Sequence, residues 1–108
     1  MRAAAVLPLA AALLAAHPSL AAVGASAART AAIKILGGDP YGRTPAEVRR
    51  SIVGQTLRRD DLCHTGKRVW KFHVVVPKSA TAPDGIDGYL ELDAANGHML
   101  CANLPLLD

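Results

Sequence analysis

Large apolar side chains alternate with polar ones through residues 69–76, which read VWKFHVVV. Side chains alternate between faces along a β-strand, so this pattern predicts a strand with one face on a core. The inward-facing members are Trp70, Phe72, Val74 and Val76. Lys71 and His73 lie between them and are expected on the opposite, solvent-facing side.

A second run, residues 86–93 (IDGYLELD), repeats the alternation. Its inward-facing members are Ile86, Gly88, Leu90 and Leu92. Tyr89, Glu91 and Asp93 fall on the other side and are expected to face solvent. The pattern therefore predicts a second strand of the same sheet.

A hairpin turn follows this second strand. Asn96 and Gly97 tolerate the positive φ angles that tight turns require, so residues 90–92 and 99–101 are predicted to pair as antiparallel neighbours. Asp93 is expected to hydrogen-bond the turn rather than to act as a catalytic acid.

One helix start is well marked. Thr44 can cap the first free amides, Pro45 suits the first helical position, and Glu47 stands where a capping box places its acid. The expected apolar stripe of this helix is Val48, Ile52 and Val53. Gly54 either ends the helix or interrupts it before one more turn.

These elements predict an α+β fold, with one helix packed on a three- to four-stranded antiparallel sheet. The fourth strand would be a short one near Leu57. Residues 58–68 are expected to form a polar connector, and residues 77–85 a loop in which contacts to a partner could lie. We expect a monomer.

The N-terminus has the three-part pattern of a secretory signal peptide. A basic residue, Arg2, precedes the apolar residues 3–16, and the small residues Ser19 and Ala21 flank Leu20 before a cleavage point. About 14 apolar residues are fewer than the roughly 20 that span a bilayer as a helix. An uncleaved anchor or a buried helix is the competing interpretation.

We therefore divide the chain into a signal peptide (1–21), a flexible leader rich in alanine and glycine (22–38) and a folded domain (39–108). Ala27 ends a second candidate cleavage site. Residues 33–36 form an apolar patch that fits either a strand or the end of a helix. The expected location is periplasmic or secreted, with contact to a membrane only through an uncleaved signal segment.

The chain has two cysteines, Cys63 and Cys101. An even number in an exported chain favours a disulfide, and two buried free thiols are the alternative. In a plain meander the two would lie on opposite edges of the sheet, too far apart to bond. A disulfide therefore requires residues 59–67 to fold back toward the last strand.

The net charge of +3 comes from basic residues that are scattered among acids, which argues against a nucleic-acid partner. Four basic residues lie in the connector of residues 58–68, namely Arg58, Arg59, Lys67 and Arg68. Asp60 and Asp61 offset two of them, so this stretch is expected to be a solvated loop rather than an anion site.

Little in the sequence points to catalysis or to a cofactor. Cys63, His64, His98 and Cys101 could form a metal site, although adjacent ligands suit tetrahedral coordination poorly. A cysteine nucleophile with His98 as its base is weak, because the other thiol is its expected disulfide partner. An enzyme would need a concave pocket that collects His73, Glu91 and a further titratable group.

Residues 88–100 (GYLELDAANGHML) resemble the closing hairpin of the PepSY domain, a small module of peptidase propeptides and exported bacterial proteins. The matching positions are Leu90, Leu92, Asp93, Ala94, Gly97, Met99 and Leu100, with Trp70, Phe72 and Val74 in the preceding strand and residues 44–53 as the helix. The two cysteines, the long 77–85 loop and the leucine-rich tail depart from the family pattern, which suggests a divergent branch.

The resemblance implies an inhibitory or chaperoning module that binds an exported peptidase or another periplasmic protein, and it brings no catalytic residues. The leading hypothesis is therefore a non-enzymatic interaction module without a cofactor. Its partner would meet an exposed sheet edge or the outward face that carries Lys71, His73, Tyr89 and Glu91. The alternative is a small periplasmic ligand- or metal-binding protein that uses the two Cys/His pairs.

Overall fold

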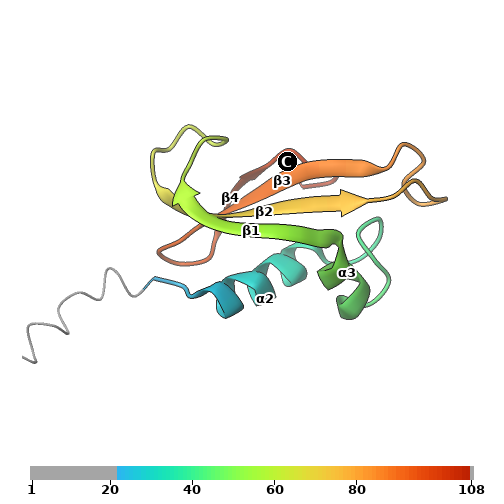
Figure 1. The fold of residues 1–108 in the computed structure, drawn as a ribbon, viewed down its shortest axis with the longest axis horizontal. Helices are drawn as coiled ribbons and strands as arrows, with labels where there is room; N and C mark the ends of the chain where they lie inside the picture. Colours follow the sequence, from blue (N-terminus) through green and yellow to red (C-terminus); the bar gives the residue numbers. More distant parts are fainter. Residues whose placement is uncertain (1–21, 108) are drawn as a thin grey trace, which may run out of the picture.

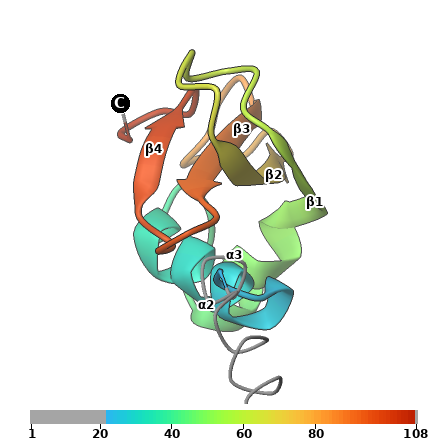
Figure 2. The same ribbon diagram turned by 90° about the vertical axis from the view of Figure 1, so that its left-hand side faces the viewer.

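The computed structural model describes residues 22–107. They form a four-stranded antiparallel sheet with strand order β1-β2-β3-β4, and two helices cover one of its faces (Figures 1 and 2). The elements are α2 (Ala25–Leu36), α3 (Pro45–Ser51), β1 (Ile52–Arg59), β2 (Arg68–Val76), β3 (Ile86–Asp93) and β4 (Met99–Ala102). The α+β prediction is confirmed, with one helix more than expected. Neither described helix is long and apolar enough to cross a membrane.

The two alternating runs form the central strands, as predicted. In the antiparallel register Trp70 is opposite Leu92 and Phe72 is opposite Leu90. Phe72, Leu90 and Leu92 are fully buried between the sheet and the helices. The hairpin prediction is also confirmed, because β4 pairs with β3 and Asp93 accepts a hydrogen bond from the Ala95 N–H in the turn.

Helix α3 begins as its sequence indicates and ends earlier than expected. The Thr44 hydroxyl accepts a hydrogen bond from the Glu47 N–H, and Pro45 is the first helical residue. The helix stops at Ser51, and the β-branched Ile52 and Val53 enter strand β1 instead. The predicted helical stripe is therefore wrong at Ile52, which is buried but lies in β1, and at Val53, which is exposed; the fourth strand is eight residues long.

Residues 22–38 are not a flexible leader. They contain helix α2, which crosses the inner face of the sheet and contacts β2 and β3. Ala28, Ala32 and Leu36 recur at helical spacing and are buried. Alanine brings the helix axis close to the sheet, so this helix packs through small side chains. The signal peptide predicted for residues 1–21 lies outside the described part of the chain.

The C-terminal tail closes the end of the core. Leu104 is buried and Leu107 packs against the core, whereas Leu106 is exposed. Gly88 makes this packing possible, because a Cβ at that position would lie 2.7 Å from the Asn103 carbonyl oxygen and 2.8 Å from a Leu104 methyl carbon. Two of the three leucines therefore tuck in, as expected.

Candidate functional site

The loop between β1 and β2, residues 60–67, folds over the face of the sheet opposite the helices, which we call the outer face (Figure 2). Cys63 in this loop forms a disulfide with Cys101 of β4, with a Cα–Cα distance of 5.7 Å. The disulfide and the fold-back that it required are both confirmed. Asp60 holds the loop in shape, because its carboxylate accepts hydrogen bonds from the N–H groups of Leu62, Cys63 and Thr65.

Glu91 lies beneath this loop. It projects to the outer face, as predicted, but it does not reach solvent: it is 0% exposed. Its cross-strand neighbours are Lys71 and Cys101, and the Cys63 sulfur lies 3.4 Å from its Oε1. A disulfide sulfur carries no proton, so this last contact is van der Waals packing and not a hydrogen bond. The covering loop is the reason why the expectation of exposure is wrong.

The burial of Glu91 changes its ionisation. Loss of solvent, together with the hydrogen bonds and negative charges of Asp60 and Asp61, raises its pKa to about 8. Glu91 therefore keeps its proton at neutral pH. Its Oε2 has no hydrogen-bond partner among the described residues.

The two aspartates shift the other way. Burial alone would raise the pKa of Asp60, but the hydrogen bonds from Thr65, Cys63 and Glu91 outweigh it and lower that pKa well below its usual range. The hydrogen bonds of Asp61 with Lys71, whose Nζ lies 2.9 Å away, and with Glu91 lower its pKa as well. At neutral pH the cluster thus holds two carboxylates, one carboxylic acid and one ammonium.

This acidic cluster suits a protonated Glu91 better than a metal ion. Oxygens of Asp60, Asp61 and Glu91 lie within 4.8 Å of one another. Each Asp60 oxygen, however, already accepts two hydrogen bonds, and the Lys71 ammonium lies 3.9 Å from Glu91 Oε2. A cation would have to displace these donors and the Glu91 proton.

The alternative metal site on the two Cys/His pairs is wrong, because both sulfurs are in the disulfide and neither can be a thiolate. The same bond removes the nucleophile considered above. The side chains of His64 and His98 are exposed, His64 in the β1–β2 loop and His98 in the turn before β4.

The uncovered end of the outer face carries a compact aromatic cluster. The rings of His73 and Tyr89 stack with centroids 4.6 Å apart, and the Lys71 ammonium lies 4.4 Å from the Tyr89 ring centre. The Asp87 carboxylate lies 2.7 Å from Nε2 of the His73 imidazole. The hollow beside these rings, about 310 Å³, does not include Glu91, so the pocket that an enzyme hypothesis required does not form there.

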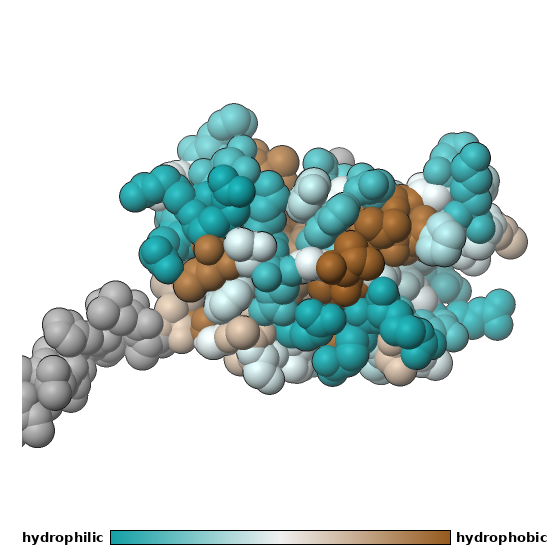
Figure 3. Space-filling model, viewed as in Figure 1, coloured by the Kyte–Doolittle hydropathy of each residue, from teal (hydrophilic) through white to brown (hydrophobic). Residues whose placement is uncertain are grey.

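Strand β1 is an open edge of the sheet. Among the described residues it pairs only with β2, so half of its backbone hydrogen-bonding groups face outward. Val53 is 58% and Leu57 40% exposed along this edge. Figure 3 views the side that carries β1 and shows apolar patches set among hydrophilic residues.

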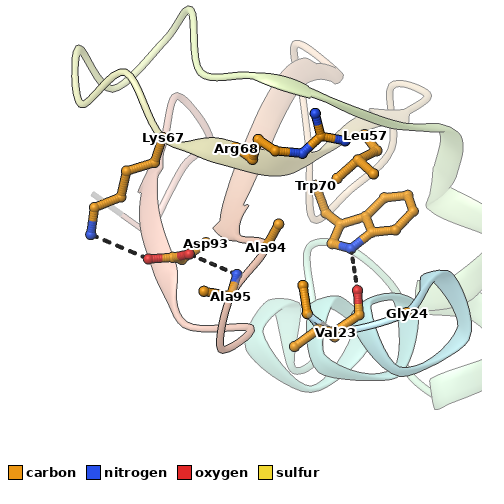
Figure 4. A pocket seen from close by; sticks show the side chains of 10 residues that line it. Val23, Gly24, Leu57, Lys67, Arg68, Trp70, Asp93, Ala94 and Ala95 are labelled. Carbon is orange, nitrogen blue, oxygen red and sulfur yellow. Dashed lines mark hydrogen bonds and ion pairs between the residues drawn. The ribbon is translucent and has the colours of Figure 1, made fainter. Parts of the chain in front are cut away.

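A groove adjoins the far end of β1 (Figure 4). Its volume is about 850 Å³, and its lining residues are Ala22, Val23, Gly24, Leu57, Lys67, Arg68, Trp70, Asp93, Ala94 and Ala95. The Trp70 indole N–H donates to the Val23 carbonyl at 2.7 Å, and the Val23 N–H donates to the Ala94 carbonyl at 2.8 Å. These bonds fix the wall between the sheet and the start of α2. Leu57 is exposed on the β1 edge and also lines the groove, so the groove continues the β1 edge.

The charges at this end are not balanced as the sequence suggested. Asp60 points into its own loop, and Asp61 is shared between Arg58 and Lys71. Lys67 pairs with Asp93 at 3.3 Å. Arg59 and Arg68 form no ion pair with a described residue, although they are exposed and directly opposite in the β1–β2 register.

Sequence reasoning missed the two elements that build the groove. The start of α2 lay in the supposed leader, and β1 was expected to be short. The two cysteines carried a signal for the longer β1, because a disulfide between Cys63 and Cys101 obliges β1 to extend as far as the loop that carries Cys63. No family model, no curated protein and no solved structure matches this chain, so the PepSY resemblance stays a prediction.

Proposed function

We propose that this protein is an exported, non-enzymatic interaction module that binds an extended segment of a partner protein along strand β1. The observation that carries the proposal is the open β1 edge, which leads into the groove through the exposed side chain of Leu57. An extended segment can satisfy the outward N–H and C=O groups of such an edge and place alternate side chains in adjoining pockets.

The other surfaces suit this role less well. The second edge strand, β4, has only four residues, and Cys101 ties it to the β1–β2 loop. On the outer face that loop covers Glu91, and His73 and Tyr89 already stack on each other. The groove also offers an apolar side chain a site against Leu57 and Trp70.

Export is supported by the disulfide, which persists in oxidising compartments. The fold also favours one of the two cleavage points. Cleavage after Ala21 leaves Val23 and its bonds to Trp70 and Ala94 in the mature chain, whereas cleavage after Ala27 removes them. We take Ala22 as the mature N-terminus. An exported peptidase is the partner class that the PepSY resemblance implies.

Capture of partners from the exported fraction tests this proposal with a pair of matched variants. Leu57→Lys alters the β1 edge, and Leu106→Lys makes the same change at an exposed leucine of the tail. The partner should bind the wild type and Leu106→Lys and be lost from Leu57→Lys. Hydrogen exchange of the β1 amides should slow in the complex. A partner that binds Leu57→Lys equally well and leaves these amides unprotected would refute the proposal.

A further inference from the structure

The end of β1 carries an unfavourable arrangement of charge. Arg59 and Arg68 are directly opposite on neighbouring strands, and side chains in such positions lie on the same face with Cβ atoms about 5 Å apart. Like charges there destabilise a sheet. The Arg59 guanidinium donates one hydrogen bond to the Gly66 carbonyl at 2.9 Å, but no described acidic side chain pairs with either arginine, and Asp61 and Asp93 are engaged by other cations.

The two arginines lie at the end of the β1 edge that adjoins the groove. Arg68 lines the groove beside Leu57 and Trp70, and Arg59 is the last residue of β1 (Figure 4). A carboxylate placed between the two guanidinium groups would relieve their repulsion and accept charge-assisted hydrogen bonds. An apolar side chain beside it would cover Leu57 and the Trp70 ring.

We propose that the segment bound along β1 is acidic: an extended peptide with carboxylates at Arg59 and Arg68 and an apolar side chain in the groove. This inference rests on the function proposed above and names the chemistry of the partner. Eight residues of β1 span about 25 Å, so the peptide has about eight residues in contact.

A second copy of this chain fits the edge less well. In an antiparallel pair of β1 strands, the Arg58 and Arg59 end of one copy lies beside the start of β1 in the other. There the last turn of α3 carries the exposed Arg49 and Arg50. Both copies also carry a net positive charge. Repulsion therefore opposes self-association and favours an acidic occupant.

Three synthetic nine-residue peptides test the charge preference. They share an apolar β-forming centre and carry acidic, amide or basic residues at both ends. Binding is followed by the fluorescence of Trp70, the only tryptophan, and by amide NMR shifts of β1. We expect the acidic peptide to bind about tenfold more tightly than the amide peptide at low salt, to lose this advantage as salt rises, and the basic peptide not to bind.

A fourth peptide has the acidic sequence with alternate backbone amides methylated, which blocks strand pairing and keeps the charge. It should not bind. The double variant Arg59→Gln/Arg68→Gln should bind the acidic and amide peptides with equal affinity. Lys78→Gln removes an exposed charge from the β2–β3 loop and should keep the full preference. Because the double variant removes a like-charge pair, its melting temperature should not fall, which separates lost binding from unfolding.

The outcomes distinguish the two proposals. If the amide and acidic peptides bind β1 equally well, the inference of an acidic partner is overturned and the edge-binding function stands. If the methylated peptide binds as tightly as its parent, pairing along β1 is refuted together with the proposed function. Concentration-dependent dimerisation that protects the β1 amides, with no peptide bound, would assign the edge to a second copy and overturn both.

Discussion

Replacement of the buried Glu91 by glutamine should stabilise the protein at neutral and alkaline pH. In the unfolded chain this carboxyl loses its proton near pH 4.5, whereas in the folded protein burial and the neighbouring aspartates hold it until about pH 8. Between these values the folded state binds a proton that the unfolded state has lost. The free energy of unfolding should therefore fall as pH rises from about 4.5 to 8 and then level off.

The size of the effect follows from the same two values. A shift from 4.5 to about 8 corresponds to about 5 kcal/mol, at about 1.4 kcal/mol per pH unit. At pH 7 this difference in pKa has already lowered the free energy of unfolding by about 3 kcal/mol relative to acidic pH. Glutamine has the shape of the protonated acid and can donate to Asp60 or Asp61, yet it never ionises. The free energy of unfolding of Glu91→Gln should thus exceed that of the wild type by about 3 kcal/mol at pH 7 and match it within about 1 kcal/mol at pH 5.

Urea denaturation at pH 5, 7 and 9 measures this difference, and an NMR titration of the Glu91 carboxyl carbon gives the midpoint directly. Asp84→Asn, which removes a negative charge from the exposed β2–β3 loop, is the control and should keep the wild-type pH profile. The rival arrangement is an ionised Glu91 paired with Lys71, 3.9 Å away. Under that arrangement Glu91→Gln would be less stable than the wild type at pH 7, and the reasoning above would be refuted.

Three further changes test other parts of the structure. Replacing Cys63 and Cys101 by alanine should lower the free energy of unfolding by about 4 kcal/mol, because the bridge closes a 38-residue loop; chemical denaturation measures it, and an unchanged midpoint would contradict this role. Ala32→Leu should overpack α2 against the sheet and cost about 1–3 kcal/mol, while Ala27→Leu on its exposed side should cost almost nothing; equal melting temperatures would show that α2 does not pack as described. The intact mass of the exported protein should correspond to a chain that begins at Ala22 and has lost two hydrogen atoms on forming the disulfide, and a chain that begins after Ala27 would disagree.

The central hairpin could be predicted because its two strands alternate large apolar residues with polar ones. Helix α2 could not, because alanine occupies its buried and exposed faces alike: Ala28 is buried and Ala27 is exposed, and nothing in their chemistry separates them. The opposite error occurred at residues 52–54, which were predicted to continue helix α3 and in fact begin strand β1. Two apolar residues after a helix start fit a helix, but Ile52 and Val53 are β-branched and favour a strand.

The environment of Glu91 depends on a contact between distant segments. Its strand and its face both followed from the alternation, but its burial depends on a loop about 30 residues earlier in the chain. The two cysteines carried the only signal of that contact. The groove likewise depends on the contact between Val23 and Trp70, and no local sequence pattern predicts that these two residues meet.

The disulfide also changes how the molecule would respond to mechanical force. A pull on the two chain ends is carried across the bond between Cys63 and Cys101, so the intervening segment, which contains β2 and β3, bears no load. The helices and β1 can be peeled away while this central hairpin stays closed. Oxidised protein should therefore stretch about 130 Å less than reduced protein, because 38 residues of contour length are withheld.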